Sequence, residues 1–318
     1  MRIAIVSDIH ANLSAFESVL ADARRRGYDT MICLGDVVGY GPDPLECVDL
    51  VRATCEWSLL GNHDFAALYE PTNFNPVARN AAFWTRQQVF AANPAEIAKA
   101  IAALEARRTS SDGADRIDQA EFERRAAYLR DPKSRVDFLF SISPRHVLLD
   151  RYICVHGSPT RPVNEYLFPS DLEQNAHRIE RSFRMLTLPS QTGAPRPVSA
   201  LVGHTHVPGF FLEDREGSDS AIEWVGVPPD VDSWTPDEND MPRGMRFILN
   251  PGSVGQPRDR DPRASYAILE TGEGGAPDRF SFHRVAYDIA RTQRKLADLR
   301  AAGADLDPWL GERLELGQ

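Results

Sequence analysis

The sequence has few of the features that mark nucleic-acid-binding, membrane or secreted proteins. Its 46 acidic residues outnumber its 36 basic ones, of which three are lysines, and the net charge is −10. So acidic a chain is not expected to bind nucleic acid non-specifically or to hold an anionic membrane surface. No apolar run approaches the roughly 18 residues of a membrane span, and the stretch after Met1 is too short for a signal peptide.

Cysteine is scarce as well, with four residues in 318 and no close pair among them. A zinc site built from cysteines is therefore not expected. Cys33 and Cys154 lie inside apolar runs, which predicts buried thiols. We therefore expect a cytoplasmic protein without a targeting segment.

What the sequence does contain is a globular composition, 42% hydrophobic and 26% charged, and an alternation of strands and helices at its start. Apolar runs at 3–6, 31–34 and 58–60 predict strands. Between the first two lies a helical stripe beginning at Phe16, which Asn12 can cap and Gly27 can end. This order predicts an α/β fold with a largely parallel sheet at its start.

The rest of the chain indicates a single domain over residues 1–318, because no repeat or clear linker divides it. An Ala-, Arg- and Glu-rich stretch at about 75–130 predicts a helical insertion, and Pro- and Asp-rich stretches at about 188–197 and 227–242 predict loop insertions. Further strands are expected at 146–149, 152–155, 200–202, 210–212, 222–225, 245–249, 266–269 and 280–283, and a last helix at about 286–301.

Five of these apolar runs are followed at once by candidate ligands. They are Asp8 and His10, then Asp36, then Asn62 with His63, then His156, and last His204 with His206. Loops at the carboxyl ends of strands in α/β sheets converge, so we expect these side chains to meet in one crevice. Members of a pair two residues apart, such as Asp8 and His10, are expected to leave the same face of an extended segment.

The residue types match a binuclear metal site. Four imidazoles, two carboxylates and one amide make seven nitrogen and oxygen ligands, more than a single ion uses. The set suits two divalent ions sharing a bridging carboxylate, Mn in the first place, with Fe, Zn, Co or Ni as alternatives. Such a site attracts a phosphate ester and activates water for in-line displacement. His63 remains free to protonate the leaving oxygen. Each histidine taken singly is better explained as a buried or surface residue that makes an ordinary hydrogen bond, but the set is not.

In this order the segments Asp8-Ile-His10, Gly35-Asp36, Gly61-Asn62-His63-Asp64, His156 and Gly203-His204-Thr205-His206 resemble the five-block signature of the calcineurin-like metallophosphoesterases. The resemblance implies a two-layer β-sandwich flanked by helices, with a dimetal site among its loops. It implies one ion on Asp8, His10 and His206, and a second on Asn62, His156 and His204. It also implies that Asp36 bridges the ions, that a metal-bound hydroxide attacks, and that His63 contacts the phosphate and protonates the leaving group.

Residues 35–42 and 250–258 resemble the small bacterial phosphodiesterase branch of this superfamily. Its protein serine/threonine phosphatases place an Asp three residues after the bridging Asp to orient the catalytic His, where this chain has Gly39. They also have Glu where this chain has Asp64. Protein phosphatase activity is therefore not expected. What orients His63 stays open, with Asp64 as one candidate and a structural role for Asp64 as the alternative.

Two further residues are candidates for substrate binding, Tyr40 and Arg258. Tyr40 is explained equally well by packing, and the alternating charges that begin at Arg258 are typical of a solvated loop. Residues 250–253 have the composition of a tight turn. The acidic residues between 230 and 240 lack the ordered spacing of a calcium loop and are interpreted as solvated.

The leading hypothesis is a hydrolase of small-molecule or nucleotide phosphate esters. Phosphodiesters are favoured because no arginine lies within the five blocks to match the dianion of a monoester. A phosphomonoesterase or nucleotide phosphatase using the same site is the alternative. A non-catalytic protein-binding scaffold is a third reading, which the presence of all seven candidate ligands disfavours.

Overall fold

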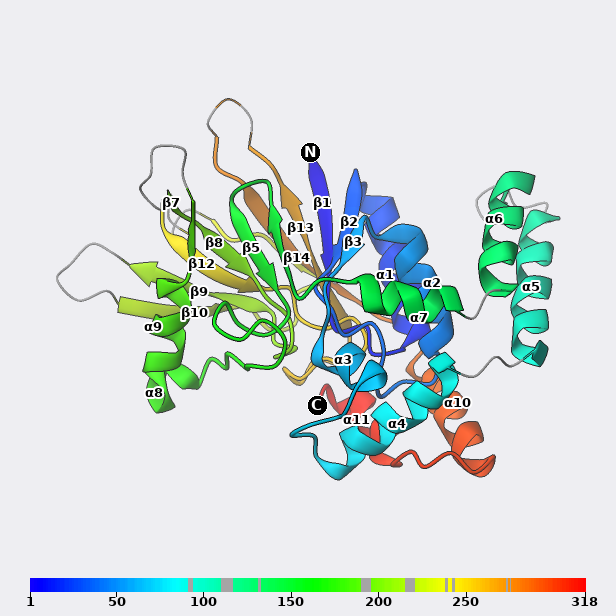
Figure 1. Cartoon of the computed structure of the whole chain (residues 1–318). Coiled ribbons are helices and arrows are strands. Elements are labelled where there is room, and N and C mark those ends of the chain that lie inside the picture. The colour runs from blue at the N-terminus through cyan, green and yellow to red at the C-terminus, as the bar shows by residue number, and fades with distance from the viewer. Residues whose placement is uncertain are drawn as a thin grey trace.

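The computed structural model describes the chain except for residues 91–93, 110–116, 131–132, 190–195, 215–220, 238–239, 242–243, 273 and 275. Two six-stranded mixed sheets face each other, and helices cover their outer faces (Figure 1). This is the two-layer sandwich flanked by helices that the resemblance implies.

The first sheet contains the N-terminal strands. Its order is β11 (Ser233–Trp234), β14 (Arg279–Val285), β13 (Ala264–Glu270), β1 (Arg2–Val6), β2 (Thr30–Cys33) and β3 (Trp57–Ser58). The strands β1, β2 and β3 are parallel, as predicted, and β13 joins β1 antiparallel, with Ala4 opposite Ile268.

The second sheet holds the remaining ligand-bearing strands. Its order is β10 (Ala221–Gly226), β9 (Gly209–Asp214), β12 (Arg246–Asn250), β8 (Ser199–Leu201), β5 (Tyr152–Val155) and β4 (Arg145–Leu148). Its central strands β12, β8 and β5 are parallel. A separate ribbon pairs β6 (Thr187–Leu188) with β7 (Arg196–Pro197).

The core explains why the first strand is apolar throughout. Ile3 and Ile5 are buried between the sheets, in the same cluster as Leu201 of β8. Ala4 and Val6 are buried on the opposite face, in the cluster under the helices. A strand covered on both faces cannot alternate with polar residues.

Helices close the outer faces of both sheets. The first sheet is covered by α1 (Leu13–Arg26), α2 (Pro44–Thr54) and α7 (Lys133–Ser141), and the second by α8 (Asp171–Gln174) and α9 (Ala176–Arg184). The ends of α1 are as predicted: the Asn12 side chain accepts a hydrogen bond from the Ala15 N–H, and Gly27 ends the helix at φ 80°.

The remaining helices lie below the ligand loops or beside the sandwich (Figure 1). Next to the ligand loops are α3 (Asn62–Leu68), α4 (Pro76–Phe90), α10 (Ile289–Ala301) and α11 (Trp309–Leu316). The last three share a small apolar cluster with Tyr40. The helices α5 (Pro94–Arg108) and α6 (Gln119–Arg130) lie side by side, away from the sheets.

Several expectations need correction. The stretch at 75–130 contains α4, α5 and α6, but both predicted loop insertions include strand residues. The two-residue strands β6 and β7 lie at the two ends of the stretch predicted as a loop at about 188–197. The strand β11 lies within the stretch predicted at about 227–242, as an edge strand on β14. Two-residue strands are too short to show a periodic pattern. The helix at 289–301 is not the last, because α11 follows it, and α8 and α9 were not predicted.

All four cysteines are free thiols, and Cys33 and Cys154 are buried as predicted. No helix in the described part of the chain has the length and hydropathy of a membrane span. The single-domain interpretation stays a prediction.

Candidate metal centre

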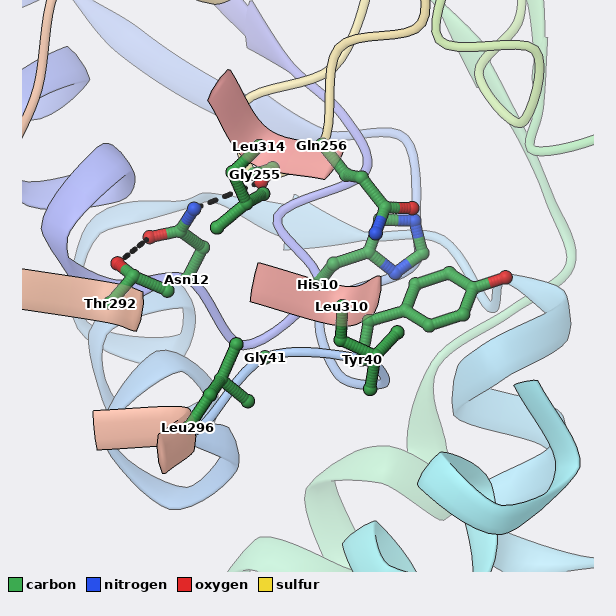
Figure 2. A pocket seen from close by; sticks show the side chains of 10 residues that line it. All are labelled: His10, Asn12, Tyr40, Gly41, Gly255, Gln256, Thr292, Leu296, Leu310 and Leu314. Atoms are coloured by element: carbon green, nitrogen blue, oxygen red, sulfur yellow. Dashed lines mark hydrogen bonds between the residues drawn. The ribbon is translucent and has the colours of Figure 1, made fainter. Parts of the chain in front are cut away.

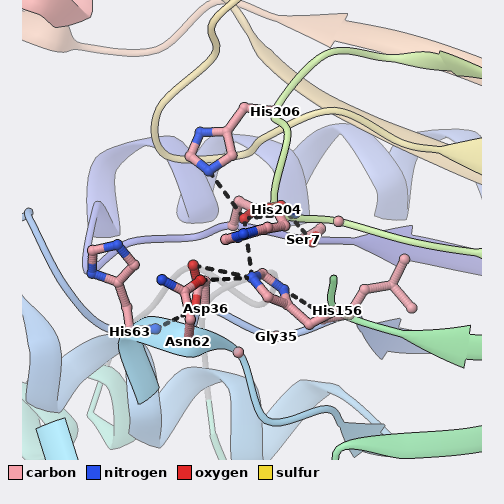
Figure 3. A network of polar contacts seen from close by, with 12 residues as sticks. Ser7, Gly35, Asp36, Asn62, His63, His156, His204 and His206 are labelled. Atoms are coloured by element: carbon pink, nitrogen blue, oxygen red, sulfur yellow. Dashed lines mark hydrogen bonds and ion pairs between the residues drawn. The ribbon is translucent and has the colours of Figure 1, made fainter. Parts of the chain in front are cut away.

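The loops that carry the candidate ligands meet at one edge of the sandwich (Figure 3). Main-chain hydrogen bonds join them there. The Asp8 N–H donates to the Gly35 carbonyl at 3.0 Å, and the Gly203 N–H donates to the His156 carbonyl at 2.8 Å. The structure thus brings together loops that follow strands of both sheets.

The side chains form three overlapping groups, in each of which the ligand atoms lie within 4.8 Å of one another: Asp8–His10–His206, Asp36–His156–His204 and His10–Asp36–His63. Asn62 joins the second group, with its Oδ1 3.2 Å from His156 Nε2. Asp36 links the groups, since its Oδ2 lies 3.2 Å from His156 Nε2 and 3.7 Å from His10 Nε2. A carboxylate in this position can reach two ions at once.

The backbone reaches this arrangement by left-handed turns, so the expectation of extended segments is wrong. Asp8 and His10 have φ values of 54° and 49°, and His204 and His206 have values of 67° and 63°. Asp36 is also left-handed, at 53°. Each such non-glycine conformation costs about 1–3 kcal/mol and persists only where the surroundings hold it, which is typical of functional sites.

The loops also approach too closely for side chains at two glycines. A Cβ on Gly61 would lie 2.0 Å from Asp36 Oδ1, and one on Gly203 would lie 2.2 Å from Ser7 Oγ. The same contacts hold the carboxylates in place: Ser7 Oγ donates to Asp8 Oδ2 at 2.6 Å, and the His63 N–H donates to Asp36 Oδ1 at 2.8 Å.

Contacts of Nδ1 with main-chain carbonyls turn the Nε2 atoms of three of these histidines into the cluster. The Nδ1 atoms of His10, His156 and His206 contact the carbonyls of Val38, Leu34 and Gln256 at 3.3, 2.9 and 2.5 Å. Donation from Nδ1 to a carbonyl is the usual arrangement of metal-binding histidines. It leaves the Nε2 lone pairs of His10 and His206 facing each other at 3.1 Å.

The cluster is therefore short of hydrogen-bond donors, and this is the observation that fits a metal. Among the described residues, His204 Nε2 is buried without a hydrogen-bond partner. Buried polar atoms are almost always paired, so such a group calls for an unseen partner. Imidazole nitrogens with carboxylate and amide oxygens are ligands that Mn, Fe, Zn, Co and Ni accept.

Electrostatics separates the histidines. Burial lowers the pKa of His10 well below its ordinary value, and the positive charges of its neighbours lower it further. For His156, burial is outweighed by the charge and hydrogen bond of Asp36, which raise its pKa to about 9. Burial alone would raise the pKa of Asp8, but His206 and His156 lower it to about 2. The carboxylates of Asp8 and Asp36, whose pKa values both lie below the ordinary value, are thus charged at neutral pH and can balance the charge of bound cations.

His63 is held by aromatic rings. Its ring centroid lies 4.3 Å from Tyr40, 4.7 Å from Phe74 and 4.9 Å from His10. Its Nδ1 is buried without a partner, and a Cβ on Gly39 would lie 2.5 Å from it. An aspartate at position 39 would therefore collide with this ring.

Asp64 has a structural role, the alternative to orienting the ring of His63. Its carboxylate accepts the Val38 N–H at 3.1 Å and the Gly61 N–H at 3.0 Å. It thus fixes the start of α3 and the loop after Asp36, and both oxygens are used in doing so.

The two candidate substrate-binding residues both lie at this site. Tyr40 is buried and packs on His63 and His10. Arg258 lies beside His206, whose carbonyl accepts the Arg258 main-chain N–H at 3.3 Å, and its Nη2 donates to Gln256 Oε1 at 3.1 Å. Its buried Nε has no partner among the described residues, so the expectation of a solvated loop is wrong for Arg258.

Four other residues belong to the site but were not assigned to it from the sequence. Asn250 Nδ2 donates to the Gly203 carbonyl at 2.7 Å, and Ser253 Oγ donates to the Asp8 carbonyl at 2.8 Å, so the turn at 250–253 holds two ligand loops. Tyr166 stacks on His204 with 3.6 Å between ring centroids. Arg313 of α11 lies over the Tyr40 ring at 5.8 Å. Tyr166 and Arg313 follow no strand-end signal that could have marked them.

The chain is similar to known proteins over most of its length. The family model described as calcineurin-like phosphoesterase matches residues 1–234. A curated protein of Methanocaldococcus jannaschii, described as uncharacterized, is 29% identical over 319 residues, which cover 99% of this chain and 98% of that protein. Among solved structures, a metallophosphoesterase from Sphaerobacter thermophilus is 36% identical, with a TM-score of 0.66, over 100% of this chain and 99% of that chain.

Proposed function

We propose that this chain, which belongs to the calcineurin-like phosphoesterase family, hydrolyses phosphodiesters at the cluster where its ligand loops meet. Family membership makes phosphoester hydrolysis with divalent metal the reaction class. The preference for diesters, the choice of Mn and the roles of single residues are the finer parts of the proposal.

One observation carries the proposal: buried nitrogen and oxygen atoms converge without enough donors to satisfy one another. Asp8, His10 and His206 would hold one divalent ion, Asn62, His156 and His204 would hold another, and Asp36 lies between the two groups. When bound, the ions polarise the phosphoryl oxygens and lower the pKa of the attacking water. Because the ligands must be deprotonated, binding also removes the proton that His156 holds in the free protein.

His63 donates a proton to the leaving oxygen. Burial, together with the positive charge of Arg258, lowers the pKa of this histidine to about 4, so the ring is neutral in the free protein at neutral pH. A bound phosphate opposes that shift, because a nearby negative charge favours the imidazolium. Tyr40 and Phe74 hold the ring so that proton transfer needs no further rearrangement.

Phosphomonoester hydrolysis at the same site is the second candidate. It is favoured by Arg258, which supplies a cation beside His206 that the five sequence blocks lack. A monoester dianion gains more from such a partner than a diester does. The substrate in either case is a small-molecule or nucleotide phosphate ester, and the free thiols fit a reducing cytoplasm.

The test compares two chromogenic esters. Protein stripped of metal and reloaded with Mn²⁺ is given bis-p-nitrophenyl phosphate or p-nitrophenyl phosphate. We expect metal-dependent cleavage with the diester faster, near-complete loss of it in Asp36→Asn, and no loss in His177→Ala, which changes an exposed histidine of α9. Faster cleavage of the monoester would favour the second candidate. Binding of two metals without cleavage of either ester would favour a non-catalytic scaffold.

A further inference from the structure

The four candidate histidine ligands are not all held in the same way. Three of them, His10, His156 and His206, contact a main-chain carbonyl through Nδ1. Figure 2 shows the ring of His10 beside Tyr40 and Gln256, which line a small cavity together with it. A hydrogen bond from the ring to a carbonyl fixes the plane of a metal-binding imidazole and the direction of its free lone pair.

The ring of His204 is held by stacking. Its Nε2 has no hydrogen-bond partner in the part of the chain that the structure describes. The ring of Tyr166 lies over it, with 3.6 Å between the centroids and an angle of 18° between the planes. The ring of Tyr40, by contrast, is tilted by 57° to that of His10. A near-parallel contact over the face of a ring restricts its tilt, as a ring hydrogen bond does for the other three histidines.

Tyr166 is fixed through the residues on either side of it. The carbonyl of the next residue, Leu167, accepts a hydrogen bond from Thr205 Oγ1 at 3.4 Å, which ties this segment to the last ligand loop. The preceding residue, Glu165, is buried, and its carboxylate accepts a hydrogen bond from Ser158 Oγ, in the loop after β5. The chain's own contacts therefore place the Tyr166 ring.

A second ring supports Tyr166. Phe168 stacks on it with 5.0 Å between the centroids and 10° between the planes, and the Phe168 N–H donates to Asp171 Oδ2 at 2.8 Å. Exposure increases along this series: His204 is 3% exposed, Tyr166 is half-buried and Phe168 is 37% exposed. The stack thus covers a face of one candidate ligand and extends from it to the surface.

We propose that Tyr166 is a positioning residue of the metal centre, whose ring holds the imidazole of His204 in the orientation in which it binds a divalent ion. The role rests on the proposed function, because the ion concerned is the one assigned there to Asn62, His156 and His204. It belongs to the aromatic ring and not to the hydroxyl group, and it concerns one of the two ion sites.

Calorimetry of Mn²⁺ binding to the metal-free full chain tests this role without relying on catalysis. Tyr166→Leu removes the ring and should weaken one of the two sites by about 10- to 100-fold, the usual loss when a group that orients a metal ligand is removed. Tyr166→Phe keeps the ring and should bind both ions as the wild type does. So should Tyr69→Leu, the same substitution at an exposed tyrosine that follows α3. His156→Ala identifies which binding step belongs to the weakened site.

Cobalt supplies a readout that a general loss of packing would not change. The visible absorption of bound Co²⁺ follows the geometry of its ligands, so at saturating Co²⁺ the spectrum should change in Tyr166→Leu and not in Tyr166→Phe. Equal weakening of both sites, or an equal loss in Tyr166→Leu and Tyr166→Phe, overturns the positioning role. If Tyr166→Leu does not fold, Tyr166→Met fills the space with a flexible chain and carries the same expectations.

The positioning role and the proposed function can fail separately. If the wild type binds two ions and cleaves neither chromogenic ester, but Tyr166→Leu weakens one site, the positioning role stands and the proposed hydrolysis fails. If the wild type shows metal-dependent cleavage, but Tyr166→Leu leaves both affinities and the Co²⁺ spectrum unchanged, the proposed function stands and the positioning role is overturned.

Discussion

Two buried polar clusters in this protein show how differently the same residue types can be used. One is the metal-centre cluster described above. The other, here called the Asp22 cluster, lies between α1 and the strands β13 and β14, and consists of Asp22, Arg26, Tyr266 and His283. Both clusters are buried and both contain aspartate and histidine.

The difference lies in how fully their polar atoms are satisfied. Asp22 Oδ2 accepts hydrogen bonds from Arg26 Nε and from the Tyr266 hydroxyl, each at 2.7 Å. His283 contacts Ser233 Oγ through Nδ1 at 2.9 Å and Ser281 Oγ through Nε2 at 3.1 Å. By contrast, His63 Nδ1 and His204 Nε2 have no partner among the described residues.

A perturbed pKa does not distinguish the two clusters. Burial lowers the pKa of both His63 and His283 to about 4. Only His63 adjoins groups that need a further ligand. The two clusters therefore differ in their unsatisfied polar atoms, whereas the lowered histidine pKa is common to both and reports burial.

The strongest test of this comparison replaces one histidine from each cluster. His63→Ala should lower kcat by about 10²–10⁴, the usual contribution of a general acid. His283→Ala should retain activity within about twofold, because hydrogen bonds to two serines contribute to stability and not to turnover. Steady-state kinetics with bis-p-nitrophenyl phosphate measures both. Equal activity of the two variants would contradict the comparison.

The next largest effect is expected from the Asp22 cluster itself. Asp22→Ala leaves the Tyr266 hydroxyl and Arg26 without their carboxylate, and should lower the free energy of unfolding by about 3 kcal/mol. Its kcat should remain close to that of the wild type. Urea unfolding and the same kinetic assay provide the two measurements. If Asp22→Ala lowered kcat strongly and left the free energy of unfolding unchanged, the Asp22 cluster would have a catalytic role, which would contradict the comparison.

Metal binding should stabilise the folded protein through the metal-centre cluster and not through the Asp22 cluster. Adding Mn²⁺ to metal-free protein at 100 times its dissociation constant should raise the free energy of unfolding by about 2.7 kcal/mol. The gain should disappear in Asp36→Asn and persist in His283→Gln. Thermal unfolding with and without the metal measures it, and a gain of equal size in all three proteins would place the metal elsewhere.

The smallest effect concerns pH. The pKa of His283 is about 4 in the folded protein, below its ordinary value of 6.5, so its contribution to stability is present above pH 6.5 and is lost as the pH falls toward 4. In His283→Gln this loss should be absent, which makes the fall of stability with pH shallower than in the wild type by up to about 1.4 kcal/mol per pH unit. Urea unfolding at pH 7, 6 and 5 checks it. Parallel curves for the two proteins would show that His283 does not titrate in this range.

Much of the fold followed from local pattern. Continuous apolar runs marked β1, β2 and β5 because these strands are covered on both faces, and α1 was bounded by its own cap and glycine. The short elements β6, β7 and β11 escaped because two residues carry no period. The helix α11 escaped because its apolar residues serve a contact with Tyr40 from the other end of the chain.

The sequence by itself determined which residues follow the strand ends, and hence the ligand types available at one edge of the sandwich. Only the tertiary structure decided how they combine. His10 meets His206 across 196 residues, Asp64 holds backbone and leaves the ring of His63 to aromatic contacts, and Arg313 of α11 lies over the ring of Tyr40. The physical reason is range: capping, periodicity and strand burial act over a few residues and are visible locally. Ligand grouping and orphaned polar atoms depend on distances that exist only once the two sheets have packed.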